Sequence, residues 1–181
     1  MLGFFKYYNF FLQNFVEGFR FLGHPISARG LNVILPVGIS FYTFQTISYT
    51  VDIYRRRIEP VSNPLEFAFY VTFFPQLVAG PIVRASQLLP QLQRKITLKN
   101  EQVTQGLFLI ATGMVKKVAI ADYLSVNLVD RVFDQPELYS GAEVVVALYG
   151  FTMQIYCDFS GYTDVARGSA KLMGLELPEN F

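Results

Sequence analysis

The feature that most constrains the fold is a run of 22 residues without a charged side chain, from Gly30 to Val51. A helix of this length, at about 1.5 Å per residue, is long enough to cross a hydrocarbon core of roughly 30 Å. Pro36 and Gly38 lie near the start of the run, and eight hydroxyl or amide side chains follow that lipid tails cannot hydrogen-bond. The run therefore predicts a membrane helix whose polar side packs against other helices or a water-filled cavity.

The composition agrees with a membrane protein. Charged residues make up 16% of the chain and apolar residues 52%, whereas soluble proteins average about 25% charged residues. A soluble lipid-binding domain is the less favoured class for this reason. The net charge of +1 gives no reason to expect a nucleic-acid partner, and the single cysteine, Cys157, excludes an internal disulfide and a cysteine-rich metal site.

A second uncharged segment, Phe67–Val83, is interrupted by Pro75 and by Gly80-Pro81. Proline inside a helix removes a hydrogen bond and clashes with the preceding turn, so a straight crossing is not expected. Basic residues lie on both sides of the segment, at 55–57 and 84–99. If basic flanks mark one side of the membrane, both ends lie on that side. The segment therefore predicts a re-entrant or interfacial element.

Two shorter uncharged runs, Gln102–Val115 and Val144–Cys157, suit buried core helices as readily as membrane spans. The pattern after Lys116-Lys117 predicts that the first of them continues as a helix. Residues 87–102 form the most polar stretch and predict a surface loop or a helix at the headgroups. Residues 134–143 predict a turn before a new helix. The predicted fold class is all-α: a polytopic membrane protein with broken and re-entrant helices.

Polar residues arrive together directly after the run that ends at Cys157. The polar cluster, defined as residues 158–164, contains Asp158, Ser160, Tyr162 and Asp164. Ionisable groups at membrane depth usually mark a functional site. Two interpretations remain open. Asp158 and Ser160 could simply cap the next helix, or Asp158 or Asp164 could orient a substrate hydroxyl or a catalytic histidine from another segment.

Familiar catalytic motifs are absent from the sequence. It contains no glycine-rich phosphate loop, no GxSxG motif and no histidine-plus-carboxylate zinc motif, so no metal site is predicted. The single histidine, His24, precedes a proline in a loop-like stretch between aromatic segments. A capping or interfacial role is more common for such a histidine than catalysis.

Four segments together resemble the membrane-bound O-acyltransferase family, in particular its alginate O-acetyltransferase branch. They are "LPVGISFYTFQTISYTVDIYR" (35–55), "FFPQLVAGPIVR" (73–84), "KKVAIAD" (116–122) and "QIYCDFSGYTDVARGSAKLMGLELPENF" (154–181). The D-alanyl transfer protein of teichoic acid synthesis is a relative of this branch. The motifs occur in the family's order and cover most of the chain from Leu31 onward. The resemblance implies that residues 1–181 are the central part of one larger acyltransferase domain.

The resemblance also implies an activity and a location. A bacterial inner-membrane, multi-pass enzyme would transfer an acyl group, with acetyl favoured, to hydroxyls of an extracytoplasmic polysaccharide such as alginate. The co-substrate would be an acyl-CoA or acyl carrier thioester on the cytoplasmic side, with no bound cofactor. Its partners would be the bilayer, the polysaccharide acceptor or periplasmic acetyltransferase proteins. A non-catalytic scaffold or transport-type component of a polysaccharide modification system is the alternative.

The resemblance assigns roles to individual residues as well. The family's catalytic histidines lie beyond the position of Phe181, and His24 does not match them, so residues 1–181 alone are expected to be inactive. Asp158 or Asp164 would orient the catalytic base or hold the acceptor. Hydrogen bonds to substrate would come from Gln154, Ser160 and Tyr162, and Gly161 would allow close backbone approach.

Overall fold

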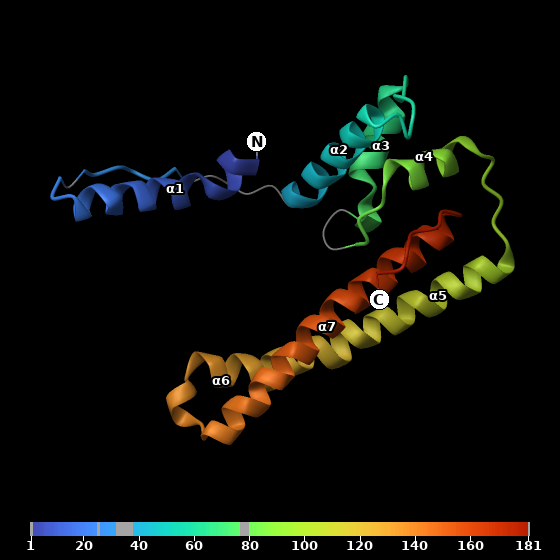
Figure 1. The fold of residues 1–181 in the computed structure, drawn as a ribbon. Helices are drawn as coiled ribbons and strands as arrows, with labels where there is room; N and C mark the ends of the chain where they lie inside the picture. Colours follow the sequence, from blue (N-terminus) through green and yellow to red (C-terminus); the bar gives the residue numbers. More distant parts are fainter. Residues whose placement is uncertain (1, 25, 32–37, 77–79, 181) are drawn as a thin grey trace.

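The computed structural model describes residues 2–24, 26–31, 38–76 and 80–180, and every regular element within them is helical (Figure 1). The all-α prediction is therefore confirmed for this part of the chain. The longer elements are α1 (Leu2–Phe21), α2 (Ile39–Tyr54), α3 (Pro64–Thr72), α4 (Ala85–Gln93), α5 (Asn100–Met114), α6 (Asp130–Asp134) and α7 (Gly141–Leu172). Short 3₁₀ segments are η1 (Phe74–Gln76) and η4 (Pro136–Leu138), and π-helical segments are η2 (Val115–Asp122) and η3 (Ser125–Val129).

The first predicted membrane helix differs from its expected bounds. Helix α2 begins after Gly38, whose φ of 76° breaks the chain direction, and it continues through Asp52 to Tyr54. Asp52 lies inside the helix and is buried, 5% exposed; Arg57 Nη1 lies 3.8 Å from its Oδ1 and offsets part of the cost of burying a carboxylate. Pro36 lies outside the described residues. None of the helices in the described ranges combines the length and the apolarity needed to cross a bilayer.

The predicted break in the second uncharged segment is confirmed. Helix α3 ends at Thr72, η1 follows, and α4 begins only at Ala85; residues 77–79 lie outside the described part. The buried Tyr70 hydroxyl donates a hydrogen bond to the Val83 carbonyl at 3.1 Å, so the chain returns to α3 after the break. Burial, followed by the nearby Asp52 carboxylate, raises the pKa of Tyr70 to about 12, which keeps this hydroxyl a donor.

An apolar core joins the broken segment to the end of the chain. Tyr70, Phe73 and Val83 pack with α4, including Leu88, and with the end of α7 and the segment after it, including Leu175. Residues 87–102, predicted as a surface loop or headgroup helix, divide into most of α4, a linker of residues 94–99 and the first residues of α5. α4 contains a proline, Pro90.

Helices α5 and α7 form the longest packing interface, an antiparallel pair that ends in the α6 turn (Figure 1). A Cβ on Gly113 would lie 2.5 Å from the Gly161 carbonyl oxygen, and a Cβ on Gly168 would lie 2.5 Å from that of Gly106. Only glycine permits backbones to approach this closely, as in helix pairs with small residues at the contact. At Gly161 this close approach is to Gly113 of α5; the role of Gly161 toward substrate stays a prediction.

The chain between these two helices follows the predicted pattern. Helical structure continues from α5 through η2 and η3 into α6, and the predicted turn precedes α7. Ser140 caps α7: its backbone N donates to Glu143 Oε2 at 2.7 Å, and its Oγ accepts from the Glu143 backbone N at 3.4 Å. Two hydrogen bonds from Ser140 to the Glu143 carboxylate lower the pKa of Glu143; the larger effect comes from the Ser140 backbone N–H and the smaller from its hydroxyl.

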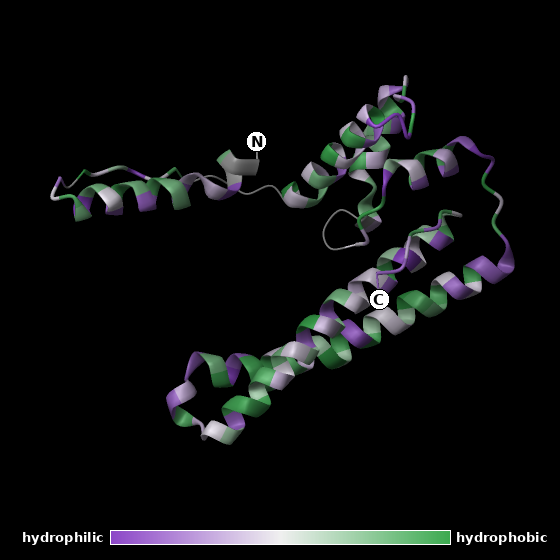
Figure 2. Cartoon of the chain, viewed as in Figure 1, coloured by the Kyte–Doolittle hydropathy of each residue, from purple (hydrophilic) through white to green (hydrophobic). Residues whose placement is uncertain are grey.

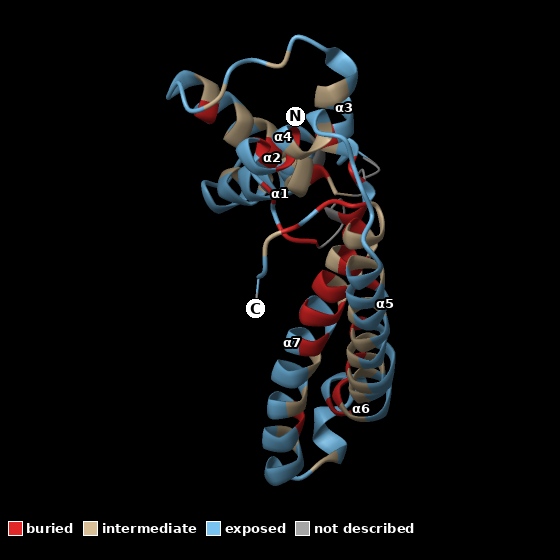
Figure 3. Ribbon diagram, turned by 90° about the vertical axis from the view of Figure 1, so that its right-hand side faces the viewer, coloured by how far each residue is buried: buried red, intermediate tan, exposed pale blue. Residues whose placement is uncertain are grey.

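The two halves of α7 have different surroundings. The C-terminal half, from Cys157 onward, is largely buried, as the red ribbon in Figure 3 shows. The N-terminal half leaves many apolar side chains exposed; Figure 2 colours the hydrophobic residues of this half green. Its large exposed side chains are Val145, Val146, Leu148, Tyr149, Phe151, Met153, Ile155 and Tyr156.

Candidate functional site

The polar cluster lies inside α7 and does not begin a new helix. α7 runs without interruption from Gly141 to Leu172, and its N-cap is Ser140. The interpretation that Asp158 and Ser160 cap the next helix is therefore wrong. Sequence alone suggested a helix end because the polar groups arrive abruptly. The helix continues because these groups find partners across the helix pair, on the π-helical segment η2.

Lys116 on η2 connects to one side of the cluster. Its Nζ lies 2.6 Å from Asp164 Oδ2 and donates to Ser160 Oγ at 3.0 Å. Ser160 and Asp164 are four residues apart and so share one face of α7. The Asp164 side chain is 13% exposed and that of Lys116 is 30% exposed. This ion pair therefore sits in the seam between the two helices, next to the Gly113–Gly161 contact.

Lys117, the next residue, connects to the other candidate carboxylate. Its Nζ lies 2.8 Å from Asp158 Oδ1 and 2.7 Å from Asp122 Oδ1. All three side chains are roughly half exposed, between 43% and 52%. The carboxylates of Asp122 and Asp158 consequently remain accessible to a further group. The carboxylate of Asp164 is much less accessible.

Neither lysine was assigned to the site from sequence, where the pair only marked the end of an uncharged run. A signal was present in the glycine spacing. Gly106 and Gly113 are seven residues apart in one uncharged run, and Gly161 and Gly168 repeat that spacing after the end of the other. Matched small residues at this period indicate two helices in contact. The π-helical geometry, a frequent feature of functional sites, could not be read from the sequence.

The remaining predicted site residues are only partly brought together. Gln154 lies one helical turn before Asp158, and its buried Oε1 has no hydrogen-bond partner among the described residues. Thr163, which sequence reasoning left without a role, is 2% exposed and its Oγ1 is likewise without a partner there. Tyr162 is half-buried. Buried polar groups of this kind usually have a partner, so they indicate positions where a further group is expected.

His24 belongs to a different part of the molecule. Its backbone N donates to the Phe19 carbonyl at 3.0 Å, in the turn that ends α1, and α1 lies away from α7 in Figure 1. Across the described ranges, no three His, Cys, Asp or Glu side chains are grouped so that they could hold a metal ion.

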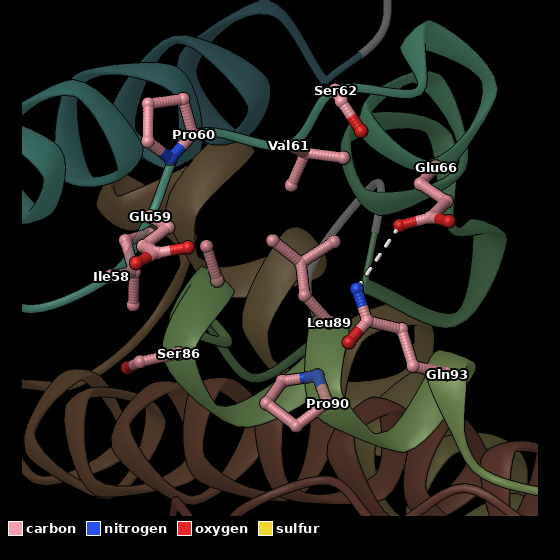
Figure 4. Close-up of a pocket in the computed structure, with 11 residues that line it drawn as sticks. Ile58, Glu59, Pro60, Val61, Ser62, Glu66, Ser86, Leu89, Pro90 and Gln93 are labelled. Atoms are coloured by element: carbon pink, nitrogen blue, oxygen red, sulfur yellow. Dashed lines mark hydrogen bonds between the residues drawn. The ribbon is translucent and has the colours of Figure 1, made fainter.

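A cavity of about 410 Å³ lies apart from the polar cluster, between the α2–α3 connection and α4. Figure 4 shows Val61 and Leu89 at its centre, with the carboxylates of Glu59 and Glu66 directed toward it from opposite sides. Gln93 Nε2 donates to Glu66 Oε2 at 3.4 Å. The residues of this cavity were not predicted from sequence, and the mixture of apolar floor and carboxylate rim indicates no single chemistry.

Comparison with known proteins places these features in a family. A family model described as the membrane-bound O-acyltransferase family matches residues 53–181. A probable alginate O-acetylase from Pseudomonas aeruginosa is 39% identical over the whole chain, which covers 34% of that protein. A peptidoglycan O-acetyltransferase from Helicobacter pylori is 35% identical, again over the whole chain and 38% of the relative.

A teichoic acid D-alanyltransferase from Bacillus subtilis is 29% identical over 89% of this chain and 41% of its own length. The chain thus spans between a third and two fifths of the length of these curated relatives. The family match includes the whole α5–α7 pair, both lysines and the polar cluster. The chain belongs to the membrane-bound O-acyltransferase family.

Proposed function

We propose that this protein is a multi-pass inner-membrane enzyme that transfers an acyl group, with acetyl favoured, to hydroxyls of an extracytoplasmic polysaccharide such as alginate. The observation that carries the proposal is similarity over the entire chain to relatives named as alginate and peptidoglycan O-acetylating proteins. Both names describe transfer of an acetyl group to a polysaccharide. The D-alanyltransferase relative leaves the identity of the acyl group less well supported than the acyl transfer itself.

In such a transfer the acceptor hydroxyl oxygen attacks the carbonyl carbon of a thioester, a base removes the hydroxyl proton, and the thiolate leaves. The base in our proposal is a histidine outside residues 1–181, at the position that the family resemblance implies. The accessible carboxylate of Asp158 is the group we assign to orient that base or to hold the acceptor. Its position beside Lys117, at 2.8 Å, holds it along one side of α7.

Asp164 has a different role in this proposal. Its carboxylate is already engaged by Lys116 in the seam of the helix pair, together with Ser160. We assign these three residues to holding α7 against η2, so that Asp158 and the buried amide of Gln154 are presented at a fixed position. Gln154 and the half-buried Tyr162 are the remaining candidates for hydrogen bonds to substrate.

The membrane location is a property of the family; inner-membrane, multi-pass topology is our proposal. It is supported by the exposed apolar surface on the first half of α7, which a bilayer or neighbouring membrane helices would cover. The break between α3 and α4 supports a re-entrant element there. The donor is proposed to be an acyl-CoA or acyl carrier thioester on the cytoplasmic side, and periplasmic acetyltransferase proteins are alternative recipients of the acyl group.

Reconstitution tests the activity. The protein containing this chain, purified into proteoliposomes, is mixed with acetyl-CoA and de-acetylated alginate, and ester formation is measured by mass spectrometry. We expect acetyl ester in the intact protein and none with residues 1–181 alone, since His24 does not match the family's histidine. Transfer by residues 1–181 that survives His24→Ala would contradict this assignment of the base. Absence of transfer from the intact protein to any polysaccharide would favour the scaffold alternative.

A further inference from the structure

A second cavity lies where the α4–α5 linker crosses the end of α7. It has a volume of about 250 Å³ and is lined by Arg94, Lys95, Ile96, Thr97, Lys99, Gln102, Gly174 and Glu176. The polar cluster and the proposed acyl transfer make no use of it. Three of its lining side chains are cationic and one is anionic, so the cavity carries an excess positive charge of two.

The walls of this basic pocket are held in place by contacts at both ends. Gln91 on α4 donates from Nε2 to the Glu176 carbonyl at 3.0 Å and accepts from the Glu176 backbone N at 2.8 Å. Ile96 packs directly on Gly174, where an added Cβ would lie 2.3 Å from Ile96 Cγ2. Gly174 has a φ of 75°, a conformation that favours glycine. The pocket is therefore a fixed feature of the fold.

The cations of the pocket are available to a ligand. No carboxylate of the described residues lies within 4.0 Å of the charged groups of Arg94, Lys95 or Lys99. In contrast, Lys116 and Lys117 on η2 both form ion pairs with aspartates. Helix α5 also begins at this pocket, and its N-terminus adds partial positive charge. The Thr97 hydroxyl supplies a neutral donor beside the cations.

We propose that the basic pocket binds a phosphate ester. A phosphate monoester carries about −1.5 to −2 charge at pH 7, which matches the excess charge of the pocket. The Arg94 guanidinium can donate two parallel hydrogen bonds to such a group, and lysines bind it as point charges. The phosphate could come from a phospholipid headgroup at the membrane surface or from a soluble phosphate-bearing ligand. Both sources present the same chemistry, and the experiment separates them.

The test compares two matched charge-removing variants of the purified protein. Arg94→Gln/Lys99→Gln removes two cations from the pocket. The control, Arg55→Gln/Arg56→Gln, removes two exposed cations that line none of the cavities described above. Helical content measured by circular dichroism is expected to be the same for all three proteins, because every substituted side chain is exposed.

Binding is measured in low salt with two probes, the soluble one by calorimetry and the lipid one by thermal shift. The soluble probe is glycerol 3-phosphate, added to protein in nanodiscs of phosphatidylcholine. The lipid probe is phosphatidic acid, compared with phosphatidylcholine alone in thermal-shift measurements on protein in nanodiscs. We expect the pocket variant to bind at least tenfold more weakly than the parent, the control to remain within twofold, and 0.5 M NaCl to weaken binding in the parent.

Dependence on the pocket with glycerol 3-phosphate supports a soluble ligand, and dependence only with phosphatidic acid supports a headgroup. The proposal is overturned if the parent binds neither probe. It is also overturned if the pocket variant binds both probes as the parent does, or if the control variant loses as much affinity. In that last case the effect would reflect net charge alone. None of these outcomes depends on acyl transfer.

Discussion

Lys116 and Lys117 are neighbours in sequence, yet their ion pairs lie in different surroundings. Lys116 reaches into the seam of α5 and α7, where Asp164 is 13% exposed, whereas Lys117 joins Asp122 and Asp158 at an open surface. A buried ion pair that loses one partner leaves an uncompensated charge, while an exposed pair contributes about 0–1 kcal/mol. The comparison therefore predicts that the first pair governs stability and that the second is free to serve function.

This contrast depends on the close approach of the two helices, which a single methyl group should disrupt. Gly113→Ala places a Cβ 2.5 Å from the Gly161 carbonyl oxygen and 2.8 Å from Val165 Cγ2. Because a backbone atom cannot move aside as a side chain can, we expect a loss of about 3 kcal/mol in the free energy of unfolding, the upper end for overpacking. Thermal denaturation in detergent measures it.

The matched control is Gly141→Ala, at the start of α7, where an added Cβ has no neighbour within 4 Å. This change should leave stability unchanged or raise it slightly, because alanine favours helix over glycine. Equal stability of the two variants would mean that α5 and α7 do not pack at their glycines. The Lys116–Asp164 seam would then lose its structural basis.

The next largest effect is expected at Asp164. Asp164→Asn removes the charge that neutralises Lys116 in the seam, and we expect a loss of about 1–2 kcal/mol in the free energy of unfolding. The value lies below that of a fully buried pair because Lys116 is 30% exposed. In a double-mutant cycle with Lys116→Met, the two losses should be less than additive. Additive losses would show that the pair does not contribute in the membrane environment.

Much of the fold follows from local sequence signals. Proline and glycine positions predicted the break between α3 and α4, and the turn at residues 134–143 was predicted together with the start of α7. The bounds of α2 were not predicted correctly. The helix begins only after the left-handed Gly38, and it continues past the buried Asp52 to Tyr54. Uncharged runs mark where apolar residues lie, but backbone conformation decides where a helix begins and ends.

The candidate site was predicted less completely than the fold. The sequence located the polar cluster and singled out Asp158 and Asp164, but it suggested a helix end where α7 continues. It also missed both lysines, since nothing in a pair of basic residues shows whether they face solvent or pair with another helix. Their partners on α7 lie more than 40 positions away along the chain. Such pairing depends on helix packing, which no local pattern contains.

Asp158 should show the smallest effect on stability and a large effect on activity. Its side chain is 52% exposed, and its partner Lys117 keeps a second carboxylate, Asp122, when Asp158 is replaced. We therefore expect Asp158→Asn to change the free energy of unfolding by less than about 0.5 kcal/mol. If the carboxylate orients the catalytic base or holds the acceptor, the rate of acyl transfer should fall by more than tenfold, at least about 1.4 kcal/mol in activation free energy.

Asp122→Asn, which removes the other carboxylate paired with Lys117, is the matched control and should leave the rate within a few-fold of the parent. Rates from the proteoliposome assay, together with thermal denaturation of the same preparations, separate the two effects. Near-normal turnover of Asp158→Asn would assign the Lys117 cluster to the protein surface alone and remove the polar cluster from our account of catalysis.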